Sequence, residues 1–196
     1  LVRIREGGKL NESVMDMLLV NTRVPQERQG DLTAQMSANL IGISRIQEAY
    51  DRYGETLIDC MEELMEYSAR RIRAAVAKLP DGEYCYTDYM DGCGEKYPHP
   101  LPIQVKITVS GDQMTVDFTG SSPQLEAPIN VPWPCTKADV FYSIKAMLGP
   151  DIPANEGINR AIRVVAPRGC ILNPTEPSPI GCQIDTSQRV PDAIFG

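Results

Sequence analysis

The strongest constraint on the fold is an alternation of apolar and polar residues on both sides of one short turn. The apolar positions are Ile103, Val105, Ile107, Val109, Met114, Val116 and Phe118, and Gly111-Asp112 divides them. A period of two is typical of a strand with one buried face, and a two-residue loop that begins with glycine favours a type II′ turn. We therefore predict an antiparallel hairpin within a meander over residues 83–120.

The first 79 residues carry helical patterns instead. Asn11 suits the N-cap of a short helix, residues 21–30 contain Pro25 and indicate a loop, and a second helix is expected from Asp31 to Tyr53, before Gly54. A third helix is expected over Glu55–Leu79. Its apolar stripe consists of Leu57, Met61, Leu64, Met65, Ile72, Val76 and Leu79.

The charges of this third helix favour a solvated face. Acidic residues come early and basic residues late, which suits the helix dipole, and Glu66 and Arg70 have the spacing of an i,i+4 ion pair.

Further along, Thr136 is the expected cap of another helix that ends at Gly149-Pro150, and a second hairpin is expected around the turn 166–169. These elements predict an α+β fold, in which N-terminal helices pack on a mostly antiparallel sheet of hairpins with a further helix. Residues 1–80 form the helical part, and residues 81–196 form the mainly antiparallel β part.

The charge balance excludes some classes of partner. Asp and Glu outnumber Lys and Arg by 26 to 19, so the chain lacks the excess of positive charge that nonspecific binding to nucleic acid or to anionic membranes needs. No transmembrane stretch or export signal is visible, and we expect a soluble, cytoplasmic protein. Because the chain begins with Leu1 and stops on apolar residues, we also expect one continuous fragment of a longer subunit.

The residues that most often carry catalysis or bind metals are sparse. His99 is the single histidine and lies between prolines, and none of the six cysteines forms a CxxC pair. Asp88, Asp91 and Cys93 lie near it, but such a grouping arises readily by chance. No G-x-S-x-G elbow is present. We assign no metal ligand and no catalytic residue to this chain.

A first polar constellation lies on the second helix. Asp31, Gln35, Asn39 and Gly42 are separated by four, four and three residues, so they share one face, with Arg45 one turn further. Together with Asn21 and Arg23, which precede the helix, they could line a pocket for a polar substrate. The alternative is structural, since Arg23 or Arg45 could pair with Asp31 and fasten the loop to the helix.

A second constellation follows the hairpin. Asp117, Ser121 and Gln124 lie in a stretch that also contains Gly120, a second serine and a proline. Such a loop can hold an anion through exposed N–H groups. Ordinary turn chemistry explains the same residues. The candidate substrate-binding residues are therefore Asn21, Arg23, Asp31, Gln35, Arg45, Asp117, Ser121 and Gln124.

Several short motifs, taken in order, resemble the hydantoinase B/oxoprolinase family. They are Asn21-Thr-Arg23-Val-Pro25, Gly30-Asp31-Leu-Thr-Ala-Gln35, Tyr53-Gly54, Pro80-Asp-Gly82, Asp91-Gly92, Val116–Gln124, Asn155-Glu-Gly157, Ala166-Pro-Arg-Gly169 and Asn173-Pro174. The resemblance spans nearly the whole chain.

The resemblance implies a B-type subunit that works with an A-type subunit, which would hold ATP and magnesium. It also implies a divalent metal of the zinc or manganese type, bound outside this stretch. The A-type subunit would use ATP to phosphorylate an amide or enolate oxygen, because an unactivated lactam is a poor electrophile.

Three functions then compete. The first is part of an ATP-dependent cyclic amide hydrolase of the hydantoin or 5-oxoproline type. The second is part of an ATP-dependent ketone carboxylase that acts on acetone or acetophenone. The third is a non-catalytic scaffold or docking segment of such a complex.

Overall fold

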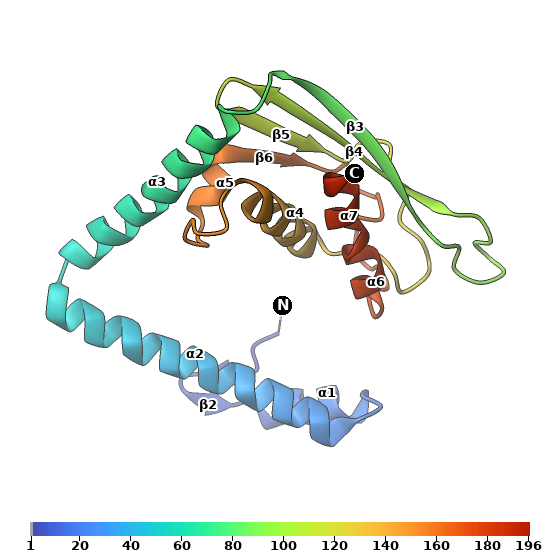
Figure 1. Cartoon of the computed structure of the whole chain (residues 1–196). Coiled ribbons are helices and arrows are strands. Elements are labelled where there is room, and N and C mark those ends of the chain that lie inside the picture. Colours follow the sequence, from blue (N-terminus) through green and yellow to red (C-terminus); the bar gives the residue numbers. More distant parts are fainter. Residues whose placement is uncertain (1) are drawn as a thin grey trace. The chain divides into compact units, whose positions relative to one another are not determined.

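The computed structural model describes residues 2–196 and is of the predicted α+β class (Figure 1). Its residues fall into two compact units, which divide between Cys60 and Met61. The first unit contains the short strands β1 (Arg5–Glu6) and β2 (Lys9–Leu10), the helices α1 (Glu12–Val20) and α2 (Pro25–Tyr53), and the first residues of α3 (Thr56–Val76). Within the described residues, no helix combines the length and the apolar character needed to cross a membrane.

The ends of α1 and α2 follow local chemistry. The side chain of Asn11 accepts a hydrogen bond from the N–H of Val14 at 3.3 Å, which confirms the predicted N-cap. Gly54 has φ +58° after the last turn of α2, as its position predicted. The start of α2 is a correction. The expected loop over 21–30 ends at Val24, because Pro25 occupies the first turn, where its fixed φ favours the helix.

The second unit is built on a four-stranded sheet. Its order is β3 (Gly82–Met90), β4 (Leu101–Ser110), β5 (Gln113–Asp117) and β6 (Ile162–Val165). Strands β3, β4 and β5 are antiparallel neighbours, and Ser110 pairs with Gln113 across the two-residue turn, where Gly111 has φ +59°. The predicted hairpin is confirmed.

The second predicted hairpin is wrong. Strand β6 pairs with β5 and runs parallel to it, while Cys170, after the turn, forms isolated bridges with Pro123 and Asn173. A parallel neighbour requires a crossover connection. The chain between β5 and β6 supplies it with the helices α4 (Trp133–Leu148) and α5 (Gly157–Ala161).

The prediction had one further helix after the hairpin, but the described residues contain four there. In addition to α4 and α5, the helices α6 (Gln183–Ser187) and α7 (Arg189–Phe195) follow β6. Helix α4 begins at Trp133, so Thr136 is not its cap. Thr136 lies inside the helix, fully buried, and its hydroxyl donates to the carbonyl of Leu172 at 2.7 Å. The sequence pattern could not distinguish a capping hydroxyl from one that bonds across the core.

The core of the second unit lies on one face of the sheet, where Figure 1 shows α4, α5 and α7. The alternate residues of β4 and β5 on that face pack against α4, α7 and the later turns of α3. The fully buried side chains include Ile72, Val76, Ile103, Val116, Phe118, Val140, Ile144 and Val190. The stripe predicted for α3 is buried only in its second half, since Met61 and Leu64 are exposed.

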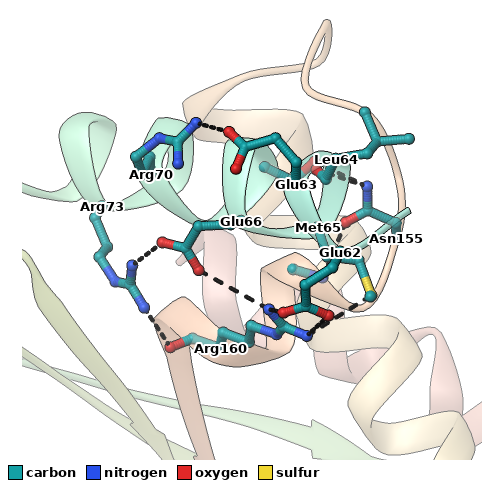
Figure 2. Close-up of polar contacts among 11 residues, drawn as sticks. Glu62, Glu63, Leu64, Met65, Glu66, Arg70, Arg73, Asn155 and Arg160 are labelled. Carbon is teal, nitrogen blue, oxygen red and sulfur yellow. Dashed lines mark hydrogen bonds and ion pairs between the residues drawn. The ribbon is translucent and has the colours of Figure 1, made fainter. Parts of the chain in front are cut away.

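The charged face of α3 is mostly exposed, as predicted, and several of its side chains also form ion pairs (Figure 2). Glu62 accepts two hydrogen bonds from Arg160 of α5, at 2.5 and 3.1 Å, and Arg73 pairs with Glu66 at 3.1 Å. Arg70 pairs with Glu63 rather than with Glu66. The acidic first turns of α3 therefore fasten the helix to α5.

A second set of contacts at the same junction involves Asn155. Its side-chain amide donates to Ser68 Oγ at 3.0 Å, and its side-chain oxygen accepts from the N–H of Gly157 at 2.9 Å. Gly157 lies directly against the carbonyl oxygen of Met65 and has no room for a Cβ. The Asn155-Glu-Gly157 motif thus joins α3 to the start of α5.

Candidate functional site

The polar face of the sheet carries a shallow hollow of about 380 Å3. Cys85, Lys106 and Asp117 lie in one row across β3, β4 and β5, because the strand register pairs Cys85 with Lys106 and Lys106 with Asp117. Thr87, Gln104 and Thr119 complete the polar lining. The hollow therefore presents a cation, a carboxylate, a thiol and an amide to one space.

The charged groups of this hollow have internal partners. Lys106 Nζ lies 3.4 Å from Glu83 Oε1. Asp117 Oδ1 accepts from the N–H and from the hydroxyl of Thr119, at 2.8 and 2.6 Å. Asp117 is half-buried and fixed in position by Thr119. A carboxylate held in this way beside an ammonium group can orient a small polar ligand that carries both donors and acceptors.

Ser121 has a structural contact of its own. Its hydroxyl oxygen accepts from the N–H of Gln104 at 3.0 Å and donates to the carbonyl of Gln104 at 3.1 Å, so it extends the pairing of β4 beyond β5. The N–H groups of Thr119, Ser121, Ser122 and Gln124 are also hydrogen-bonded within the chain. These contacts favour the turn interpretation over an anion-holding loop. A direct contact of Ser121 with substrate stays a prediction.

Gln124 ties its loop to the segment after β6. Its side-chain oxygen accepts from the N–H and the hydroxyl of Thr175, at 2.6 and 2.9 Å, and its amide donates to the carbonyl of Thr175 at 3.3 Å. Thr175 therefore occupies the side-chain oxygen of Gln124 and one of its two N–H donors. A contact of Gln124 with substrate stays a prediction.

The first constellation lies in the first unit, on and before α2. Asp31 pairs with Arg28 at 3.0 Å, and Arg45 pairs with Glu48 at 2.8 Å. The side chain of Asn21 donates to the carbonyl of Met17 at 2.8 Å. Asp31 therefore pairs with Arg28 and not with Arg23 or Arg45. Arg28 lies one turn before Asp31 on the same helix, because α2 begins earlier than predicted.

Gln35 and Asn39 do share a surface, as the four-residue spacing predicted. Both line a groove of about 560 Å3 between α2 and the N-terminal segment. The remaining lining is mostly apolar and consists of Val2, Ile4, Arg5, Gly8, Leu32, Met36, Leu40 and Ile43. Arg23, Asp31 and Arg45 do not line it. The groove therefore presents two amides and one cation, Arg5, among apolar side chains.

Sequence reasoning missed the apolar side of α2. Leu32, Met36, Ile43, Ile46, Tyr50 and Tyr53 recur at spacings of four and three, with Asn39 at the remaining position. No residue of α2 is buried, and Ile43 is 67% exposed. The spacing was visible in the sequence and could have been found, since a stripe of this kind is typical of a helix that packs against another helix.

The residues present do not fit a metal site. Within residues 2–196, no three His, Cys, Asp or Glu side chains lie close enough together to hold an ion. Asp88 faces Arg189 at 3.7 Å, and His99 is exposed. The divalent metal implied by the resemblance therefore has no ligand set among these residues.

A half-buried carboxyl and a buried thiol have shifted pKa values. Burial raises the pKa of the Asp139 carboxyl in α4, although the hydroxyl of Ser187 donates to it at 2.6 Å and opposes the shift. Burial also raises the pKa of the Cys170 thiol, against hydrogen bonds from nearby backbone groups. A thiol that is held protonated is a poor nucleophile, so Cys170 does not qualify as a catalytic residue.

Comparison with known proteins gives concordant results. The hydantoinase B/oxoprolinase family model matches residues 1–196. The B-type chain of a putative D-/L-hydantoinase from Pseudomonas sp. (strain NS671) is 35% identical over 205 residues, which cover 99% of this chain and 35% of that protein.

Two solved structures resemble the chain. The crystal structure of the ATP-dependent caprolactamase from Pseudomonas jessenii superposes with a TM-score of 0.85 at 28% identity, over 98% of this chain and 34% of that one. The nucleotide-free structure of acetone carboxylase superposes with a TM-score of 0.79 at 15% identity, over 93% of this chain and 26% of that one, which shows a shared fold. The chain spans about a third of the length of the hydantoinase and caprolactamase relatives.

Proposed function

Because the chain belongs to the hydantoinase B/oxoprolinase family, we propose that it forms part of the B-type subunit of an ATP-dependent hydrolase that opens cyclic amides. The observation that carries the proposal is the match over the whole chain to this family, together with similarity to a hydantoinase chain and to a caprolactamase. Both relatives are named for cyclic amides. Acetone carboxylase is 15% identical and supports the fold alone.

The proposed complex contains an A-type subunit that holds ATP and magnesium. Hydrolysis of an unstrained lactam is slow because its carbonyl is a poor electrophile. Phosphorylation of the carbonyl oxygen would give an imidate with a good leaving group. The B-type subunit would then position the activated ring and admit water. A divalent metal of the zinc or manganese type would be bound by residues of that subunit other than those of this chain.

Within this chain, the groove beside α2 and the hollow on the sheet are two separate proposed points of substrate contact. Gln35 lines the first and Asp117 lines the second. Asn21, Arg23 and Asp31 would contribute through the surface around the start of α2, and Arg45 would contribute from the second half of the same helix. The chain is in this proposal a substrate-positioning part of the subunit, and the complex as a whole carries out the reaction.

An assay of the assembled complex tests the proposal. Purified complex is incubated with ATP, magnesium and, separately, hydantoin, 5-oxoproline or ε-caprolactam, and the ring-opened product and ADP are measured together. We expect ring opening coupled to ADP formation with at least one of the three. Turnover that instead requires bicarbonate and a ketone such as acetone or acetophenone would assign the complex to the carboxylases.

The scaffold alternative is tested with substitutions in the same complex. Asp31→Ala and Arg23→Ala remove exposed charges from the proposed substrate surface. The matched control on the same helix is Asp51→Asn, whose carboxylate accepts a hydrogen bond from Gln47. We expect the first two to lower kcat/KM about tenfold or more, with assembly intact, and the control to have no effect. Unchanged turnover for both variants would show that this surface is scaffold.

A further inference from the structure

The first compact unit has almost no core of its own. Among residues 2–60, Met15 is the one buried residue. Helix α2 has 29 residues, and none of them is buried. A domain of about 60 residues that folds alone buries about 60% of the surface that its unfolded chain exposes. The first unit therefore lacks the apolar contacts that such a domain needs, and another part of the protein has to supply them.

The exposed apolar side chains gather on the second half of α2. We define the α2 docking surface as the large apolar residues that lie exposed on this half of the helix. They are Leu40, Ile41, Ile43, Ile46, Tyr50 and Tyr53. Their exposed fractions range from 39% for Tyr50 to 67% for Ile43. A contiguous exposed apolar surface of this kind marks a site of interaction in a soluble protein.

The α2 docking surface extends to opposite sides of the helix. One stripe, with spacings of three and four, consists of Ile43, Ile46, Tyr50 and Tyr53. Because an α-helix turns by about 100° per residue, Ile41 lies on the side opposite to Ile43. Residues 40–43 carry no polar side chain on any side. A helix that is apolar all round is typically enclosed by other elements of the protein.

The charges in this half of α2 are largely satisfied within the helix. Arg45 pairs with Glu48 at 2.8 Å. Asp51 accepts a hydrogen bond from the amide of Gln47 at 2.8 Å. A partner of this surface therefore needs no compensating charge, and its affinity would come mainly from the burial of apolar area.

We propose that the rest of the B-type subunit covers the α2 docking surface with apolar faces of its own. This inference rests on the proposed function, since that proposal makes the chain part of a longer subunit. The match covers 35% of the hydantoinase chain and 34% of the caprolactamase chain, so roughly two-thirds of each relative lies outside it. That length is enough for a further domain with its own helices.

A second copy of this chain fits the surface less well. Two identical helices in a coiled coil cover one stripe of each other. Such a pair would bury the stripe that contains Ile43 and would leave Ile41, on the opposite side, in contact with water. Burial of both sides requires elements on more than one side of α2, which a further domain of the same subunit can supply. The surface begins after Gln35, so the proposal does not require the groove beside α2 to be filled.

Hydrogen exchange of backbone amides tests the proposal. The 196-residue chain, the complete B-type subunit and the purified complex are exchanged under the same conditions, and peptides from residues 40–53 are followed by mass spectrometry. We expect the amides of these residues to exchange about tenfold or more slowly in the subunit and in the complex than in the chain alone. Peptides from β4 and β5, which already belong to the core sheet, should change little and are the internal control.

A charge placed on the surface provides a second test. Ile43→Asp should lower the Tm of the complete subunit by about 3 °C or more, because the carboxylate would be buried without a partner. The same substitution should change the Tm of the 196-residue chain by less than about 1 °C, because Ile43 is exposed there. Ile43→Leu keeps the apolar area and is the matched control. A subunit that fails to fold with Ile43→Asp, while the variant chain folds, is the same result in stronger form.

Several outcomes would overturn the inference. Equal exchange of residues 40–53 in the chain and in the subunit would show that the rest of the subunit does not cover α2. Protection that requires the A-type subunit would make that subunit the partner. A dimer of the 196-residue chain in sedimentation, dissociated by Ile43→Asp, would make the partner a second copy. No readout depends on turnover, so an inactive complex with a protected α2 would refute only the proposed hydrolase, and an active complex with an unprotected α2 would refute only this inference.

Discussion

Gly157, the first residue of α5, lies in direct contact with the backbone carbonyl of Met65 in α3, and a Cβ at this position would overlap that oxygen. At the same junction, Asn155 bonds to Ser68, and Arg160 bonds to Glu62 (Figure 2). Because the contact is between two backbone segments, a Cβ at this position could be accommodated only by a shift of α3 or α5.

Gly157→Ala should therefore destabilise the chain. We expect a loss of about 2–3 kcal/mol in the free energy of unfolding, because the new methyl group must push α3 and α5 apart. Urea denaturation followed by circular dichroism measures it. Gly181→Ala is the matched control, since its Cβ would lie 3.7 Å from Pro128 Cβ, at ordinary contact distance. Equal losses for the two variants would contradict the explanation.

The ion pair between Glu62 and Arg160 should depend on salt and pH. Arg160 lowers the pKa of the Glu62 carboxyl through its hydrogen bonds. A carboxyl whose pKa is lowered by folding stabilises the folded state at pH values above its unfolded-state pKa. This contribution is lost as the pH falls through the folded-state pKa.

Arg160→Ala should then lower Tm at neutral pH, and less so in 1 M salt, where exposed charges are screened. The difference from the parent chain should shrink as the pH falls. Arg3→Ala removes an exposed i,i+3 pair with Glu6 and serves as control. A Tm difference that salt and acid leave unchanged would show that packing of the Arg160 side chain, and not its charge, accounts for the effect.

Asn130 should be among the least replaceable polar residues. It is fully buried, its amide donates to three backbone carbonyls, and its oxygen accepts from the N–H of Leu125 at 2.9 Å. Asn130→Ala would leave these groups without partners, and we expect a loss of about 3 kcal/mol. Asn21→Ala, which removes one exposed bond, should cost less than about 0.5 kcal/mol. Chemical denaturation measures the free energy of unfolding of both variants, and equal losses would contradict the prediction.

Asp139 should have the opposite pH dependence to Glu62. Burial raises its pKa, so the folded state binds a proton more tightly than the unfolded state does. The stability from this group is fully present at low pH and is lost as the pH rises through the raised folded value.

Asp139→Asn keeps an acceptor for the hydroxyl of Ser187 and removes the titration. Relative to the parent, the variant should gain stability as the pH rises above the usual range of an aspartate carboxyl, because only the parent then acquires a half-buried charge. Denaturation series at several pH values measure this gain. If the free energy of unfolding depended on pH in the same way in both proteins, the carboxyl would be as easily ionised in the folded chain as in the unfolded one.

The sequence predicted those features whose cause is local. The turn at Gly111 depends on one positive φ, the cap at Asn11 on a side chain three residues from its partner, and the end of α2 on Gly54. For the candidate site, the spacing of Gln35 and Asn39 correctly placed them on one surface. Each of these depends on residues within a turn of one another.

Long-range partners could not be predicted in this way. Thr136 has the sequence context of a cap, and only the core shows that it bonds to Leu172. Arg160 pairs with Glu62, 98 positions away, and Gln124 with Thr175, 51 positions away. A small pocket lined by Trp133 and Pro174 was likewise not predictable, because its two walls come from segments that meet only in the folded chain.

The sequence by itself determined the family, the α+β class and the central hairpin, because short motifs, helical periodicity and strand alternation are written in consecutive residues. Only the tertiary structure decided that β6 runs parallel to β5 and that Glu62 of α3 pairs with Arg160 of α5. The physical reason is that these features depend on which surfaces the core brings together, and burial, unlike periodicity, is a property of the whole chain.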